Sequence, residues 1–243
     1  MRTILSTLLP IALAERGQNG WKINCQVTTG DVGPAFTAVT DNADGSHNIE
    51  WSYFSLSHAG VRSAGPFEDF GGDHYCESAD NSTNQVVVDG LFDWPNNINP
   101  VPAGTFGKGQ PANLFIAADG FATPIARDGC LAVFDITGEN IDQDNMFFVS
   151  KGCGQQGALT TKWYYHVTKF IDMDKDGDLD IVTARSSGAT NPLDPKDTQL
   201  LWFENPGRSY NVDNRNWNEH VISVGNNIAD VSVDVTTINK QIY

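Results

Sequence analysis

The sequence is poor in basic residues and has no long apolar run. It carries 15 lysines and arginines against 30 aspartates and glutamates, a formal net charge of −15 at pH 7. A surface this acidic repels phosphate groups, so we expect no nucleic acid partner and no anionic lipid partner. No stretch approaches the roughly 20 apolar residues of a membrane-spanning helix, so we expect no membrane span. Cations, neutral sugars and basic surfaces are left as partner classes.

Helical periodicity is also missing beyond the first residues. Short runs rich in Val, Ile, Phe, Trp and Thr alternate instead with turns, to which the 23 glycines and 11 prolines contribute. We expect an all-β fold with 40% hydrophobic residues to fill its core. Segment 92–111, rich in proline and glycine, is expected to be a long ordered loop. The expected strands are 85–88, 131–136, 146–149, 180–184, 200–203 and 220–224.

The N-terminus has the features of an export signal. Met1 and Arg2 are a short basic start, residues 4–14 are mostly apolar, and residues 12–14 (ALA) form a small-x-small cleavage pattern before Glu15. We expect residues 1–14 to be a secretory signal peptide, which makes the mature protein secreted and extracellular. The alternative is an apolar first strand that stays in the fold.

The four cysteines include no CxxC pair, so they indicate neither a zinc site nor a redox motif. In an oxidising compartment an even count predicts two disulfide bonds, with three pairings open. Cys130 and Cys153 flank two apolar runs separated by a turn, as expected at the open end of a hairpin. We therefore favour Cys130–Cys153, which leaves Cys25–Cys76. Asn81 begins an Asn-Ser-Thr sequon and is the candidate N-glycosylation site.

Internal repeats organise the body of the chain. Residues 134–138 (FDITG) match 203–207 (FENPG), and each follows an apolar strand and precedes another. Upstream, residues 117–120 (AADG) align with 174–177 (DKDG), and 42–45 (NADG) is an earlier, degraded copy. Repeats of short strands are typical of propeller blades, in which each small sheet needs its neighbours to bury its faces.

One segment, residues 170–182 (FIDMDKDGDLDIV), carries a specific chemistry. Five aspartates alternate along it: Asp172, Asp174, Asp176, Asp178 and Asp180. A hard cation takes about six to eight oxygens, and a loop turning at Gly177 aims alternate carboxylates inward, with the carbonyl of Asp178 free to join. Thr183 stands where an EF-hand has Glu, and the flanks are strand-like, so we reject an EF-hand. The alternative, a solvated acidic turn, would leave the carboxylates repelling one another.

Together with residues 200–207 (LLWFENPG) and 217–222 (WNEHVI), this loop resembles the FG-GAP/VCBS family of secreted β-propellers. The strong match covers residues 163–224, with weaker echoes back to about residue 39. The resemblance implies a propeller over residues 15–243 and a structural Ca²⁺ between strands of a blade. The implied ligands are the side chains of Asp172, Asp174, Asp176 and Asp180 and the carbonyl of Asp178.

The other copies depart from the family's ligand pattern. The first copy offers a marginal set: Thr40, Asn42, Asp44 and Asn48. Around Gly120, Phe115 and Ala117 replace two carboxylates, so we expect no metal there.

The repeat spacing predicts three to four blades, whereas propellers have about four to eight. We therefore expect an incomplete ring from a truncated larger propeller, with a four-bladed ring or closure with a second chain as alternatives. An incomplete ring predicts self-association.

Two classes of function follow from this sequence. We prefer a secreted, calcium-stabilised binding module for a glycan or an extracellular protein, with no catalytic residue, because no acid/base pair or nucleophile motif stands out. Trp94, Trp163 and Tyr164 are the candidates for stacking on a sugar ring, although propeller aromatics are more often core. His220 fits a structural position. The alternative is a propeller enzyme, such as a carbohydrate lyase or a cyclase, with its site in the central channel; fold alone does not decide.

Overall fold

The structure is a computed structural model of the full chain. It describes residues 11–17, 20–27, 34–41, 44–54, 59–67, 86–89, 95–111, 113–120, 129–135, 146–150, 163–187, 197–207, 217–226, 233, 237–238 and 241–242. These residues form strands, turns and irregular segments, and none of them is helical. The expected all-β fold is confirmed.

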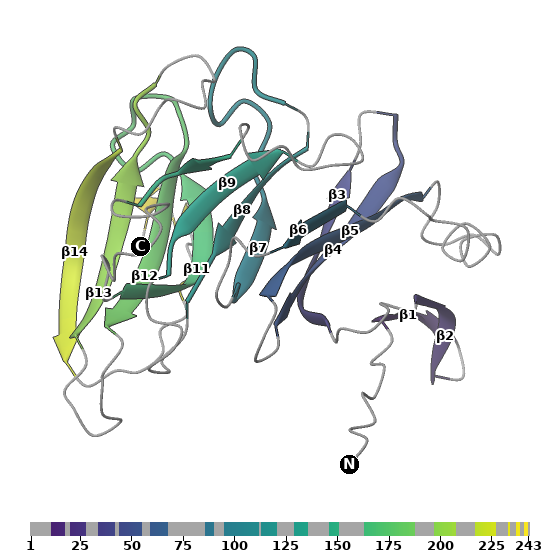
Figure 1. The fold of residues 1–243 in the computed structure, drawn as a ribbon. Coiled ribbons are helices and arrows are strands. Elements are labelled where there is room, and N and C mark those ends of the chain that lie inside the picture. Colours follow the sequence, from purple (N-terminus) through teal and green to yellow (C-terminus); the bar gives the residue numbers. More distant parts are fainter. Residues whose placement is uncertain are drawn as a thin grey trace.

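Three four-stranded antiparallel sheets follow one another along the chain (Figure 1). The first sheet consists of β3 (Pro34–Asp41), β4 (His47–Phe54), β5 (Ala59–Phe67) and β6 (Val86–Asp89). The second consists of β7 (Asn97–Pro100), β8 (Leu114–Ala118), β9 (Leu131–Asp135) and β10 (Phe147–Phe148). The third consists of β11 (Trp163–Ile171), β12 (Asp180–Ser187), β13 (Asp197–Glu204) and β14 (Asn218–Asn226). In each sheet, strands that are consecutive in sequence are also neighbours in space.

Two short two-stranded sheets complete the described elements. One pairs β15 (Thr237–Ile238) with β16 (Gln241–Ile242). The other pairs β1 (Ile11–Gly17) with β2 (Gly20–Val27), so that a strand crosses the expected cleavage position after Ala14. Residues 1–10 lie outside the described residues, and the signal peptide stays a prediction.

The six expected strands overlap β6, β9, β10, β12, β13 and β14, whose bounds differ from the expected ones. The predicted hairpin pairs β9 with β10 through Val133 and Phe147. The expectation of a loop over 92–111 is wrong at its centre, because Asn97–Pro100 form β7 and pair with β8. The physical reason is the position of the prolines: Pro100 is the last residue of the strand, so the preceding residues keep their ladder donors.

The repeat alignment is right in one part and wrong in another. The matched pairs Phe134–Asp135 and Phe203–Glu204 each end the third strand of a sheet. Residues 44–45 of the first copy and residues 174–177 each lie between a first strand and a second. Asp119 and Gly120, however, follow β8 and lead toward β9, so they are not the counterpart of residues 176 and 177. The counterpart in the second sheet is segment 101–113, whose sequence contains no Asp or Glu.

The second sheet is buried on both faces, and the side chains of its strands alternate between two core clusters. One face packs against the third sheet, with Leu114 and Ile116 in one cluster with Ile181, Leu201 and Phe203. The opposite face forms a second cluster with Val61 of the first sheet: Ile98, Phe115, Ala117, Ala132 and Phe134. The first strands also meet, since β7 contacts both β3 and β11. The three sheets are therefore stacked through apolar faces.

Candidate metal site

The acidic loop occupies residues 172–179 between β11 and β12 of the third sheet. Its turn requires left-handed backbone at two positions, Lys175 with φ 67° and Gly177 with φ 105°. A Cβ at Gly177 would meet no atom within 4 Å, so this glycine is needed for its conformation and not for space. The turn folds the alternating aspartates toward one point.

Three carboxylates converge in this loop. One oxygen each of Asp172, Asp174 and Asp176 lies within 4.8 Å of the others. Backbone amides orient all three: Gly177 N donates to Asp172 Oδ2 (3.2 Å), Asp176 N to Asp174 Oδ1 (3.2 Å) and Asp178 N to Asp176 Oδ1 (3.1 Å). Asp172 Oδ1 is shielded from solvent and has no hydrogen-bond partner within the described part of the chain. Burying a carboxylate oxygen without a hydrogen-bond partner costs free energy unless the oxygen binds a cation.

Asp180 is the first residue of β12, and its side chain connects the start of the acidic loop with the residue that follows β13. Its side chain is almost fully buried, with 1% exposed. Met173 N donates to Asp180 Oδ2 at 2.8 Å, and Asn205 N donates to Oδ1 at 2.9 Å. Burial raises the pKa of Asp180 despite these two hydrogen bonds, and the charges of Asp174 and Asp176 add to the rise. In this arrangement Asp180 positions the loop, and its role as a ligand stays a prediction.

Asp178 is the carboxyl group of the loop whose ionised form is most disfavoured. Burial, followed by the charge and contact of Asp176, raises the pKa of Asp178 to about 6. Its Oδ1 is also shielded and has no hydrogen-bond partner among the described residues. Gly207 borders this carboxylate: its φ is 61°, and a Cβ there would come within 2.8 Å of Asp178 Oδ2. A cation in the loop would relieve this carboxylate, because an adjacent positive charge favours the ionised form.

The donor set consists of oxygen atoms only and fits a hard divalent cation. Asp172, Asp174 and Asp176 would hold such an ion. An ion held there would supply positive charge to the loop.

In the corresponding loop of the first sheet, the aspartate carboxylate already has hydrogen-bond partners within the loop. Asp44 Oδ1 accepts hydrogen bonds from Ser46 N at 2.9 Å and Ser46 Oγ at 2.6 Å. The hydrogen bond from the Ser46 hydroxyl lowers the pKa of Asp44. Asn42 lies outside the described residues, and within the described ranges the acidic group of the third sheet is the one that meets the geometric requirement for a metal.

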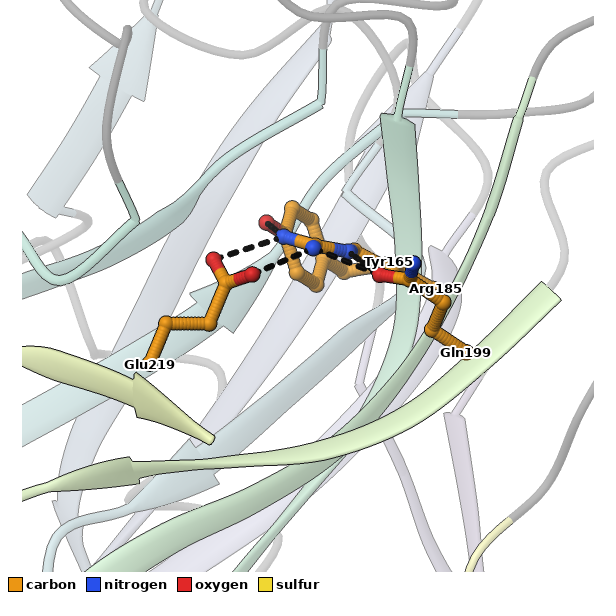
Figure 2. A network of polar contacts seen from close by, with 4 residues as sticks. All are labelled: Tyr165, Arg185, Gln199 and Glu219. Carbon is orange, nitrogen blue, oxygen red and sulfur yellow. Dashed lines mark hydrogen bonds and ion pairs between the residues drawn. The ribbon is translucent and has the colours of Figure 1, made fainter. Parts of the chain in front are cut away.

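A second polar cluster, which the sequence did not reveal, joins all four strands of the third sheet (Figure 2). Arg185 on β12, with 7% of its surface exposed, donates from Nη1 to Glu219 Oε2 (2.9 Å) and from Nη2 to Glu219 Oε1 (2.5 Å). Its Nε and Nη2 also donate to Gln199 Oε1, and its Nη1 lies 3.4 Å from the Tyr165 hydroxyl. Trp163 packs its ring 4.4 Å from the guanidinium.

The Arg185 network is structural. Burial opposes the charge of Arg185, but the hydrogen bonds with Glu219 and Tyr165 outweigh it and raise the pKa of Arg185. Burial raises the pKa of Tyr165 as well, so the phenol keeps its proton. Because Glu219, Gln199 and Tyr165 engage every nitrogen of the guanidinium, no donor is left for a ligand.

The aromatic candidates differ in how accessible they are. Tyr164 is 0% exposed, so its ring cannot stack on a ligand. Trp163 is partly buried and has Arg185 over one ring face, which leaves at most the other face. Trp94 lies outside the described residues. His220 has a structural environment: its ring stacks on Trp202 at 4.2 Å, and its Nε2 lies 2.7 Å from Glu204 Oε2.

The cysteine and glycosylation predictions are only partly covered by the structure. Cys130, directly before β9, is disulfide-bonded. Cys153, Cys76 and Asn81 lie outside the described residues, and Cys25 is placed only as a position in β2. The pairings Cys130–Cys153 and Cys25–Cys76 therefore stay predictions.

Comparisons with protein-family models, with curated proteins and with solved structures gave no match. Among the described residues, no helix has the length and apolar character needed to cross a membrane.

Proposed function

We propose that the protein is a calcium-stabilised, all-β binding module, in which an ion held by Asp172, Asp174 and Asp176 orders the connection between β11 and β12. The observation that carries the proposal is the convergence of three carboxylates within 4.8 Å, together with the shielded, unpartnered Oδ1 of Asp172. An ion bound only by the folded state stabilises it by about 2.7 kcal/mol at a hundredfold excess over its dissociation constant.

The proposed architecture is a β-propeller of the FG-GAP/VCBS type, with each four-stranded sheet as a blade. Two features support it. The three sheets share one strand order and stack through apolar faces. Their first strands lie together, since β7 contacts β3 and β11, as expected for strands that line a central axis.

The proposed setting is extracellular, and the proposed ligand is a glycan or another secreted protein. The disulfide at Cys130 supports this setting, because disulfides persist in oxidising compartments. Extracellular calcium sites bind weakly, at roughly 10⁻⁴ to 10⁻³ M, which suits an exposed acidic loop.

Thermal unfolding of the full chain tests the calcium proposal. After treatment with EDTA the melting temperature should fall by several degrees, and Ca²⁺ should restore it more effectively than Mg²⁺. The double variant Asp172→Asn/Asp174→Asn should lose the response. Asp41→Asn is the matched control, because Asp41 is an exposed carboxylate in the first sheet, outside the loop. An unchanged melting curve in metal-free protein, verified by metal analysis, would contradict the proposal. A glycan array beside a carbohydrate-lyase assay then separates the binding module from the enzyme.

A further inference from the structure

We infer that Asn205 is a positioning residue that couples ion binding in the acidic loop to the neighbouring second sheet. The inference rests on the proposed function, because it concerns what the bound ion does elsewhere in the fold. Asn205 directly follows β13 and is 4% exposed. Asn205 is not a predicted ligand, and the sequence alone assigns no role to its side chain.

Asn205 makes two contacts with the base of the acidic loop. Its backbone N donates to Asp180 Oδ1 at 2.9 Å, and its Nδ2 donates to the carbonyl of Leu179 at 3.0 Å. Asp180 Oδ2 in turn accepts from Met173 N at 2.8 Å. Both ends of the loop are thus connected to Asn205.

The same side chain reaches the second sheet. Asn205 Nδ2 donates to the carbonyl of Thr105 at 2.5 Å, across 100 residues of sequence. Its Oδ1 accepts from Gly207 N at 3.2 Å, which fixes the orientation of the amide. Since an amide nitrogen carries two hydrogens, the Leu179 and Thr105 carbonyls use its full donor capacity.

Thr105 belongs to segment 101–113, the connection between β7 and β8. The Thr105 Oγ1 donates to the Pro102 carbonyl at 2.8 Å, and Phe106 N donates to Gln110 Oε1 at 2.8 Å. Phe106 is 5% exposed and packs edge-on against Phe147 and Trp217, with ring centroids 5.4 and 5.7 Å apart. A contact at Thr105 therefore bears directly on the core between the second and third sheets.

These contacts give a physical route for coupling. Without an ion, the repulsion among the carboxylates loosens the loop, and the positions of Leu179 and Asp180 become less defined. The Asn205 amide then loses its orientation, and the Thr105 carbonyl loses a buried partner, which is costly. An ion that orders the loop restores both contacts. Because coupling is reciprocal, removal of the Thr105 contact should also weaken ion binding.

Hydrogen exchange of the full chain, measured by mass spectrometry with Ca²⁺ as the added metal, tests the coupling. In the wild type, Ca²⁺ should slow short-time exchange in segment 172–180 and in segment 101–113, relative to peptides from the first sheet. In Asn205→Ala the protection should be confined to 172–180, and the calcium affinity should fall about three- to tenfold, the effect of one lost hydrogen bond.

Asn99→Ala is the matched control. Asn99 also joins the second and third sheets, donating from Nδ2 to the Thr168 carbonyl at 2.8 Å, but its hydrogen bonds within the described part of the chain involve Asn97 and Thr168 and not the acidic loop. This variant should keep the wild-type response in both segments.

The outcomes separate this inference from the proposed function. If calcium protects 172–180 in the wild type but leaves 101–113 unchanged, the coupling is overturned while the metal site stands. Protection of 101–113 that persists in Asn205→Ala also overturns it. If Ca²⁺ does not bind at all, both proposals fail. Should Asn205→Ala not fold, the wild-type experiment decides by itself.

Discussion

Two loops at the same place in their sheets, residues 44–46 and 172–179, share a turn geometry but differ in the charge that they carry. Each connects a first strand to a second and has glycine in left-handed backbone, with φ 87° at Gly45 and 105° at Gly177. In each, the aspartate before the glycine accepts a hydrogen bond from the amide two residues ahead, at 2.9 Å for Asp44 and 3.1 Å for Asp176.

The loops differ in what stands after the glycine. In the first sheet it is Ser46, whose hydroxyl donates to Asp44 and lowers the pKa of that carboxyl. In the third sheet it is Asp178, a second carboxylate, whose pKa is raised to about 6. The Asp44 carboxylate therefore has hydrogen-bond partners without an ion, whereas the third loop carries four aspartates against one basic residue, Lys175. The turn geometry alone does not distinguish the two loops; the carboxylates that it carries do, and in the third sheet Asp172, Asp174 and Asp176 converge.

The largest expected effect comes from removing carboxylates from one loop or the other. Asp172→Asn/Asp174→Asn should abolish the calcium-dependent stabilisation, about 2.7 kcal/mol at a hundredfold excess of Ca²⁺ over its dissociation constant. Asp44→Asn in the first loop should leave that stabilisation intact. The measurement is chemical denaturation with and without Ca²⁺. An equal loss in both variants would show that the two loops do not differ as described.

Transplanting the serine of the first loop into the third should weaken the demand for an ion. In Asp178→Ser one carboxylate is removed and a hydroxyl donor is placed next to Asp176. We expect the metal-free variant to melt a few degrees above the metal-free wild type, and the shift on adding Ca²⁺ to shrink. A metal-free variant that melts below the wild type would contradict this account.

The two loops should respond to pH in opposite directions. For Asp178 the folded-state pKa of about 6 lies above the ordinary 3.8, so between these values the folded state binds a proton that the unfolded state has released. The stability of metal-free protein should therefore fall as pH rises through this window. For Asp44 the pKa is lowered, so its contribution is present above 3.8 and is lost as pH falls below that value.

Melting temperatures of metal-free and calcium-loaded protein between about pH 3 and pH 8 check this prediction. Calcium should flatten the decline between pH 4 and pH 6, because the ion keeps Asp178 ionised in the folded state. The same decline with and without calcium would assign it to another group. Asp178→Asn provides the control, since it cannot titrate.

The smallest effect is expected from Ser46→Ala. The variant loses the hydroxyl of the buried Ser46, which donates to the exposed carboxylate of Asp44 at 2.6 Å. We expect a slight loss of stability that is the same with and without Ca²⁺. A change in calcium response here would mean that the first loop also contributes to ion binding.

The sequence predicted the acidic loop because its pattern is local. Alternating aspartates around a glycine turn lie on one side whatever surrounds them, and the structure brings Asp172, Asp174 and Asp176 together. The match of Phe134–Asp135 with Phe203–Glu204 was right for a similar reason, since each pair ends a strand. The match of 117–120 with 174–177 was wrong because small and acidic residues end strands as readily as they form loops.

The remaining features depend on contacts between distant residues. Arg185 meets Glu219 across 34 residues and Gln199 across 14, and no spacing in the sequence indicates that these side chains converge. Asn205 and Thr105 are separated by 100 residues and belong to different sheets. Strand β7 was missed because its composition is that of a loop, and its pairing with β8 decides its conformation.

Isothermal titration of EDTA-stripped, full-length protein with Ca²⁺ tests the central claim most directly. We predict one ion per chain, bound by the wild type and by Asp44→Asn, with binding lost in Asp172→Asn/Asp174→Asn. Absence of binding to the wild type, or binding that survives the double substitution, would contradict the claim that the acidic loop is the metal site.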